Sequence, residues 1–283
     1  MSVRIGHHLC LGMLAGLCMA NVWASAERPT LVLGYPEREK KPFMAEAPNN
    51  AGIYQAILKR AAERVGAELK IERLPKKRIF QYMSEGRVDL YPGNPTAERS
   101  KSMAWILLGM RSRNICLVRA DVPSFRHLSE APPLRLIHEV GDSHADLAIQ
   151  YPQLKGVLAA AQISMHDAVR MLRGGYGDLF VTQRETYLYY LHTQKVASLA
   201  RYQIRYEEDC IGPEREHVLG VAKNSRHYAE RNNPEFNPDR PVDLNNPSAL
   251  IDPASLIGRL REALLEMQAS GETKQIADRH LAR

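Results

Sequence analysis

The sequence predicts an α/β fold that is divided into two similar lobes. Short apolar strands alternate with amphipathic helices, which is the pattern of sheets flanked by helices. One helix-end pattern occurs in each half of the chain, as Gly86-Arg-Val-Asp-Leu and as Gly175-Tyr-Gly-Asp-Leu. A late strand at 217–222 is expected to return toward the first lobe. Two lobes explain this repetition better than one continuous sheet does.

The first half contains three predicted strands and two predicted helices. Apolar residues at every fourth position predict an amphipathic helix that ends at Gly66. Strands separated by helices imply a parallel sheet, in which ligands bind beyond the carboxyl ends of the strands. The predicted elements are a strand at 30–33, a helix at 53–65, a strand at 68–72, a helix at 77–85 and a strand at 88–91.

The second half repeats this order in weaker form. A strand at 134–137, a helix at 166–172 and a strand at 178–181 are predicted. Residues 231–253 are dense in Asn, Pro and Asp, which is typical of an irregular surface segment. The terminal helix is expected to begin with Asp252 as its N-cap, to bury the apolar stripe within 257–267, and to end at Gly271.

The first 26 residues resemble a secretory signal peptide. Arg4 precedes an apolar stretch, and Ala24-Ser25-Ala26 provides the small-residue cleavage site. A retained N-terminal anchor is the alternative. Cys18 follows Leu17, which does not fit a lipoprotein signal. We therefore expect a soluble periplasmic product that starts at Glu27.

Composition restricts the class of partner. Residues 27–283 contain 37 Lys and Arg against 32 Asp and Glu, a net charge near +5. Because no long basic run occurs, a nucleic-acid partner is not expected. A mild positive charge in an exported protein suits an anionic ligand or a negatively charged envelope surface. No Walker loop, Rossmann fingerprint or Gly-x-Ser-x-Gly motif occurs, so no cofactor and no nucleophilic catalysis are indicated.

Cys116 and Cys210 are the two cysteines that remain after residue 26. In an oxidising compartment we expect them to form a disulfide; two separately buried thiols are the alternative. Metal binding is a poor explanation because neither CxxC nor HxxxH spacing accompanies them.

Three separated motifs follow one another in the first half of the chain: Leu74-Pro75-Lys76-Lys77-Arg78, the Gly86-x-x-Asp89 pattern and Thr96-Ala97-Glu98-Arg99. In this order they resemble the motifs of the extracellular solute-binding proteins of the polar-amino-acid type (family 3), and the end of the chain resembles the family's last helices. The resemblance covers about 30–125 and 255–282. It implies a type II periplasmic-binding fold with a two-strand hinge. The implied division is a signal peptide at 1–26, a first lobe at 27–113 and 223–283, and a second lobe at 114–222.

The same resemblance implies the ligand-binding residues of the first lobe. Arg99 would grip a ligand carboxylate with its planar guanidinium, and Asn94 and Thr96 would contribute polar groups. A solvated arginine and an ordinary helix cap are the alternatives for Arg99 and Thr96. Three further candidates are left open between a ligand contact and a plain structural role: Arg78, Tyr35 and Phe43.

In the second lobe the resemblance implies an anion contact at Ser143, in the loop Gly141-Asp142-Ser143. Amino-acid binders usually place an aspartate five residues beyond the position of Asp178, where this chain has Gln183. A neutral amide cannot pair a buried ammonium group. We therefore expect an anionic solute without a free α-amine.

The expected function is capture of a small anionic solute by hinge closure, without catalysis, for an inner-membrane ABC permease. A monomer is expected. The alternatives are an accessory that presents its ligand to an envelope sensor, or a periplasmic dehydratase on the same fold. Asp142, His144 and Glu185 are the acid–base candidates for such an enzyme.

Overall fold

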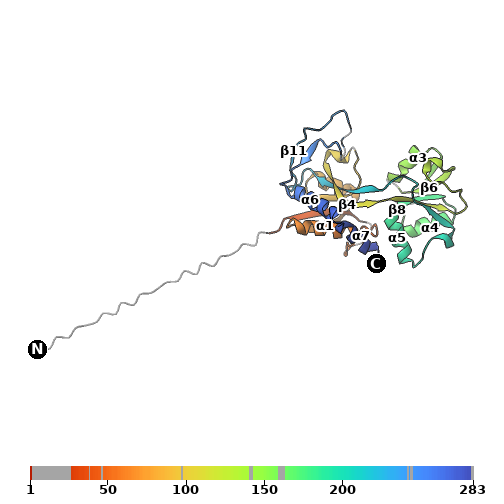
Figure 1. Ribbon diagram of the computed structural model, residues 1–283, viewed down its shortest axis with the longest axis horizontal. Coiled ribbons are helices and arrows are strands. Elements are labelled where there is room, and N and C mark those ends of the chain that lie inside the picture. Colours follow the sequence, from red (N-terminus) through yellow and green to blue (C-terminus); the bar gives the residue numbers. More distant parts are fainter. Residues whose placement is uncertain are drawn as a thin grey trace.

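A computed structural model describes residue 1 and residues 27–281, apart from residues 38, 46, 97, 140–142, 159–162, 241, 243 and 244. Residues 2–26, where the signal peptide is predicted, lie outside the described residues. Two lobes lie side by side, with strands running between them, as Figure 1 shows. None of the helices in the described part of the chain is both long and apolar enough to cross a membrane.

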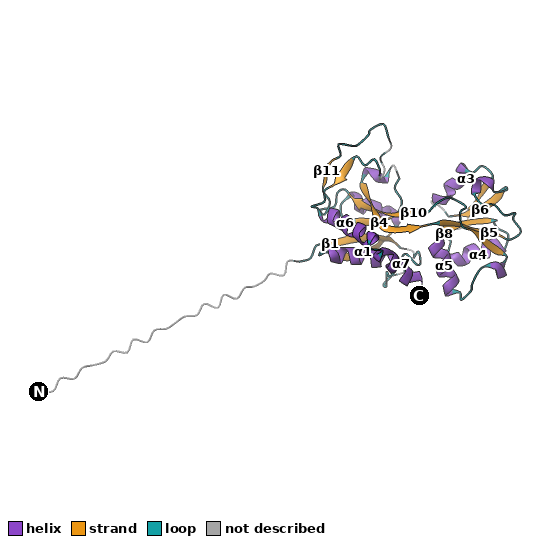
Figure 2. Ribbon diagram, in the orientation of Figure 1, coloured by secondary structure: helices purple, strands orange, loops and turns teal. Residues whose placement is uncertain are grey.

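The first lobe is built on a five-stranded sheet with helices on both faces (Figure 2). One face packs against α1 (Ile53–Arg64), α6 (Leu256–Ala269) and α7 (Glu272–Leu281), and the other packs against α2 (Lys76–Ser84). In spatial order the strands are β2 (Glu68–Leu74), β1 (Thr30–Pro36), β3 (Leu90–Pro92), β10 (Arg215–Ala222) and β4 (Met103–Ser112).

The second lobe has the same layered construction. Helices α4 (Met165–Arg173) and α5 (Arg184–Thr193) cover one face of its five-stranded sheet, and α3 (Leu147–Gln150) and η2 (Leu128–Glu130) lie on the other. In spatial order the strands are β7 (Leu154–Leu158), β6 (Leu134–His138), β8 (Leu179–Gln183), β5 (Asn114–Arg119) and β9 (Ile204–Glu207). The α/β two-lobe prediction is confirmed.

The repeated Gly-x-x-Asp pattern has the same two roles in both lobes: its glycine ends a helix, and its aspartate joins two neighbouring strands. Gly86 and Gly175 end α2 and α4 with positive φ values of 72° and 68°, which favour glycine. Asp89 then accepts a hydrogen bond from the backbone N–H of Val32 in β1 at 2.7 Å, and Asp178 accepts one from that of Arg135 in β6 at 3.0 Å. Each aspartate therefore ties the amino end of one strand to its neighbour.

The chain crosses between the lobes twice. β4 continues through Arg113 into β5, and residues 208–214 lead from β9 back to β10. Since β10 lies in the first sheet, the predicted second-lobe range 114–222 is too long: the return occurs before Arg215. The sequence placed the boundary at the end of this strand, because strand periodicity does not reveal which sheet a strand joins.

Two further details differ from the sequence-based expectation. The segment 231–253 is bracketed by a short antiparallel pair, β11 (Glu230–Asn232) with β12 (Ala249–Ile251). The N-cap of α6 is Ser255, whose hydroxyl accepts from the N–H of Gly258 at 2.9 Å. Asp252 instead accepts from Ala254 in the turn before the helix, at 2.9 Å.

The predicted disulfide between Cys116 and Cys210 is present, with a Cα–Cα distance of 6.0 Å. Both residues are fully buried against the η2 side of the second sheet. Cys116 follows the outgoing crossing and Cys210 lies within the returning one, so the bridge closes a loop that contains most of the second lobe.

Replacing both cysteines with alanine should lower the free energy of unfolding by about 2–5 kcal/mol, because the 94-residue loop then gains freedom in the unfolded chain. Urea titration of the oxidised protein and of the double variant measures this. A reductant should lower the midpoint of the wild type and leave that of the variant unchanged. Equal midpoints, or two thiols that alkylate without reductant, would contradict the structural role of the bridge.

Candidate functional site

The two sheets present the carboxyl ends of their parallel strands to each other. β10 is antiparallel to both β3 and β4, so β1 and β3 run in the direction of β4, toward the second lobe. β8 is antiparallel to β5, so β8 and β6 run back toward the first lobe. The loops after β1, β3, β6 and β8 therefore lie on facing sides of the lobes, which we name the inter-lobe face. This is the end of a parallel sheet where ligands bind.

Arg99 lies in the loop after β3, as the first residue of η1 (Arg99–Lys101). Its guanidinium carbon lies 4.6 Å from the centre of the Phe80 ring, and its Nη1 donates to the carbonyl oxygen of Asn94 at 2.9 Å. The Thr96 hydroxyl accepts from the backbone N–H of Arg99 at 3.2 Å, which is a capping contact. The structure thus brings Asn94, Thr96 and Arg99 together.

Arg99 has free hydrogen-bonding capacity. It is half-buried, and no carboxylate within the described residues pairs with its guanidinium. Burial raises the pKa of the neighbouring Tyr91, and the positive charge of Arg99 partly offsets this shift. A guanidinium carries five N–H donors in a fixed fork, so several remain for an incoming anion. Arg78 lies exposed in the first turn of α2.

Tyr35 and Phe43 belong to the core of the first lobe, which is the structural role that the sequence left open. Both are fully buried. Tyr35 lies within β1 and not in the loop that follows it. The Arg73 guanidinium lies 5.2 Å from the Tyr35 ring centre and donates to the carbonyl oxygens of Pro36 and Ala45. Arg73 therefore fixes the loop between β1 and α1.

Behind this loop lies a buried aromatic cluster that the sequence analysis missed. Phe43 packs against Tyr54 and His217, with ring centres 5.1 and 5.3 Å away. The Tyr54 hydroxyl and Nδ1 of His217 lie 2.8 Å apart in a hydrogen bond. Burial, aided by Lys40, lowers the pKa of His217 to about 4, so the imidazole is neutral near pH 7.

From the second lobe, β8 and α5 deliver Gln183 and Glu185 to the inter-lobe face. Gln183 is the last residue of β8, and its side-chain oxygen is buried without a hydrogen-bond partner among the described residues. The hydroxyl oxygen of Thr186, in the first turn of α5, is likewise buried without a hydrogen-bond partner among the described residues. Both atoms can bond to a polar group that enters between the lobes.

Glu185 joins the second lobe to the hinge. Its carboxylate accepts a hydrogen bond from the hydroxyl of Ser112, the last residue of β4. Burial raises the pKa of Glu185, although the Ser112 hydrogen bond opposes the shift. Burial raises the pKa of Tyr54, and the nearby charge of Glu185 adds to that shift. A buried carboxyl group with a raised pKa is a candidate proton donor or acceptor.

The remaining second-lobe candidates are only partly described. Gly141 and Asp142 lie outside the described residues, and Ser143 begins η3 (Ser143–Asp146). Within the described residues, no group of three or more His, Cys, Asp or Glu side chains is placed to hold a metal ion. Sequence signals for the missed residues are weak: Tyr54 falls in the buried stripe of α1, and His217 begins the buried part of β10.

Comparison with known proteins identifies structural neighbours but no sequence family. No family model and no curated protein matches the chain. The substrate-binding protein of an amino acid ABC transporter is 20% identical with a TM-score of 0.59, covering 90% of this chain and 100% of that chain. The ligand-binding core of GluR0 in complex with L-glutamate is 14% identical with a TM-score of 0.64, covering 91% and 99%. An ancestral amino acid-binding protein described as a precursor of cyclohexadienyl dehydratase is 15% identical with a TM-score of 0.60, covering 89% and 95%.

The neutral, buried state of His217 should make stability depend on pH. Its pKa falls from 6.5 in the unfolded chain to about 4 in the folded protein, so the unfolded chain binds the proton first as pH drops. The contribution to the free energy of unfolding should be constant above pH 6.5 and should fall by about 3 kcal/mol by pH 4.

Urea unfolding of the wild type and of His217→Gln at pH 7 and pH 4.5 tests this assignment. Glutamine keeps a hydrogen-bond acceptor for Tyr54 but does not titrate in this range. The variant should lose less stability between the two pH values than the wild type does. Identical losses would show that His217 is not the group responsible.

Proposed function

The chain has a type II periplasmic-binding fold, and from this premise we propose that it captures a small solute carrying a carboxylate by closing its two lobes. We further propose that the protein acts in the periplasm as the binding component of an ABC-type importer. By their descriptions, the three structural neighbours reported above bind amino acids or belong to an amino acid transporter. The fold places two lobes around two crossing strands, which permits hinge closure.

The proposal that the solute carries a carboxylate is supported by the position of Arg99 on the inter-lobe face. Its guanidinium is held in place by Phe80 and by the Asn94 carbonyl but has no carboxylate partner in the described part of the chain. Such a preorganised fork binds a carboxylate through two parallel hydrogen bonds. Lys76, Lys77 and Arg78 begin α2 on the same side of the lobe and add positive potential.

The second lobe favours a solute without an ammonium group. Gln183 offers a neutral amide whose oxygen has no partner, and it cannot neutralise a buried cation. Burial raises the pKa of Glu185, the nearby carboxyl group, and so disfavours its charged form. A solute with a carboxylate at one end and a hydroxyl or amide N–H at the other would satisfy both lobes.

A thermal-shift screen of organic acids, amino acids and short peptides would identify the solute. A compound present at 100 times its dissociation constant should stabilise the protein by about 2.7 kcal/mol. Arg99→Ala should abolish this shift and change the unliganded stability by about 1 kcal/mol or less, because only the contacts with Phe80 and Asn94 are lost.

Two further variants complete the test of Arg99. Arg99→Lys should recover only part of the shift, because lysine keeps the charge but not the fork. Arg259→Ala, an exposed arginine on α6 far from the inter-lobe face, should retain the full shift. Undiminished binding by Arg99→Ala would remove Arg99 from the site.

A lyase that acts on the same solute is the second candidate function. The observation in its favour is Glu185, a buried carboxyl group with a raised pKa at the inter-lobe face, together with a structural neighbour described as a precursor of a dehydratase. Mass spectrometry of the identified solute after incubation with the protein separates the two functions. Under solute binding alone, the wild type and Glu185→Gln should both return the solute unchanged. Conversion by the wild type that is lost in Glu185→Gln would favour the lyase.

A further inference from the structure

The end of the second lobe that faces away from the first lobe holds most of the excess positive charge. It comprises residues 119–135, 151–155, 173–178 and 194–207, which connect the strands at the amino ends of β6 and β8. We name this region the second-lobe pole. It contains eight Lys and Arg against four Asp and Glu, whereas residues 27–283 contain 37 against 32. Four of the five excess positive charges therefore lie here.

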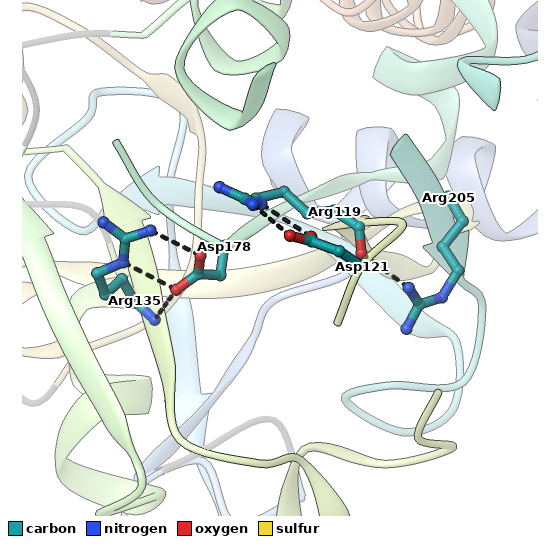
Figure 3. Close-up of polar contacts among 5 residues, drawn as sticks. All are labelled: Arg119, Asp121, Arg135, Asp178 and Arg205. Carbon is teal, nitrogen blue, oxygen red and sulfur yellow. Dashed lines mark hydrogen bonds and ion pairs between the residues drawn. The ribbon is translucent and has the colours of Figure 1, made fainter. Parts of the chain in front are cut away.

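Each of the four acidic residues of the second-lobe pole already accepts a hydrogen bond from an arginine of the pole. Arg135 donates to Asp178 at 2.8 Å, Arg119 donates to Asp121 at 2.9 Å, and Arg205 donates to Glu207 at 2.9 Å. Figure 3 shows the first two pairs, together with the Arg205 guanidinium close to Arg119. Glu130 accepts from the backbone N–H of Arg126 at 3.3 Å. These carboxylates do not neutralise the other cations.

Two of those cations, Arg173 and Arg201, flank a tyrosine at the surface. Their guanidinium carbons lie 4.9 and 4.5 Å from the centre of the Tyr202 ring. Both arginines are exposed, and neither has a carboxylate partner among the described residues. A surface pocket of about 330 Å³ is lined by Arg173, Tyr202, Gln203 and the paired Arg119 and Asp121, together with Ala120 and Leu172. It is large enough for a side chain. Arg173 is its lining cation without a carboxylate partner among the described residues, and Arg201 contacts Tyr202 without lining the pocket.

The composition of this surface favours a protein partner over a free anion. Arginine and tyrosine are the residues most enriched at the energetic centres of protein interfaces. Tyr176, three residues after the end of α4, is 66% exposed and adds a second surface aromatic to the second-lobe pole. We propose that the second-lobe pole is a docking surface for an acidic segment of a partner protein, with a carboxylate side chain seated between Arg173, Arg201 and Tyr202.

A comparable pocket on the first lobe lacks this charge imbalance. It measures about 390 Å³ and contains Arg64 and Arg259 together with Glu262 and Glu266. Arg64 pairs with Glu266 at 3.5 Å and also contacts Glu272. Arg259 is thus an exposed arginine beside a pocket of balanced charge, which makes it a matched control for Arg173 and Arg201.

The test uses the full mature protein and a fluorescein-labelled hexaglutamate peptide as the acidic probe, followed by fluorescence anisotropy at low and high salt. The combined variant Arg173→Glu and Arg201→Glu should weaken peptide binding by about tenfold or more, and Arg259→Glu by about twofold or less. Salt should weaken wild-type binding, because the surface is exposed. Hydrogen exchange should show peptide-dependent protection at 173–176 and 200–203.

The neutral pair Arg173→Gln and Arg201→Gln repeats the test if the charge-reversed protein is unstable. Equal weakening by the pole and control variants would overturn the proposal, as would absence of protection at the pole.

Vesicles with about 30% anionic lipid and inorganic phosphate serve as competing probes. If the vesicles or phosphate bind more tightly than the peptide does, and the pole variants lose that binding, the surface recognises a membrane or a free anion. Such a result would overturn the proposal of a protein partner. Because the pole lies at the opposite end of the strands from the inter-lobe face, these outcomes are independent of solute capture.

Discussion

The antiparallel pairing of the crossing strands determines how the rest of the molecule can function. β10 pairs with β4 on the first-lobe side, and β5 pairs with β9 on the second-lobe side. The Cys116–Cys210 bridge fixes the outgoing and returning chains next to each other. Because the parallel strands of each sheet take their direction from these crossings, the carboxyl ends of both sheets must face each other. The space between the lobes is then bordered by the loops after these strands and by the start of α5, and loops can change without disturbing either core.

The opposite ends of the strands are held by one interaction that occurs in both lobes. Asp89 and Asp178 each accept a backbone N–H from the adjacent parallel strand. Asp89 is nearly fully buried and also accepts from the Ser225 hydroxyl at 2.5 Å, whereas Asp178 binds the Arg135 guanidinium. The same backbone contact therefore belongs to a closed core in one lobe and to a charged surface in the other. This difference lets the amino end of the second lobe take part in recognition.

Burial sets the charge states at the inter-lobe face. It lowers the pKa of His217 to about 4, and it raises the pKa values of Glu185 and Tyr91. In a low-dielectric setting an unpaired charge is costly, so a half-buried guanidinium without a carboxylate partner attracts an anion strongly. The face therefore combines Arg99 and the exposed cations that begin α2 with neutral polar groups such as Gln183 and Thr186, which suits selection by shape and by hydrogen bonds.

Local patterns in the sequence were sufficient to predict the two lobes and the disulfide, and the family resemblance singled out Arg99 in the loop after the third strand. The prediction of the lobes depends on residues close together in the sequence: a glycine that ends a helix, an apolar stripe and the Gly-x-x-Asp repeat. The disulfide was predictable because two cysteines allow a single pairing. The tertiary structure alone decided that Tyr35 and Phe43 are core residues, that β10 joins the first sheet, and that Ser255 caps α6. It also decided the pairing of Tyr54 with His217, 163 positions apart, and of Ser112 with Glu185. Burial and long-range hydrogen bonds depend on how distant segments pack, and no local periodicity encodes that packing.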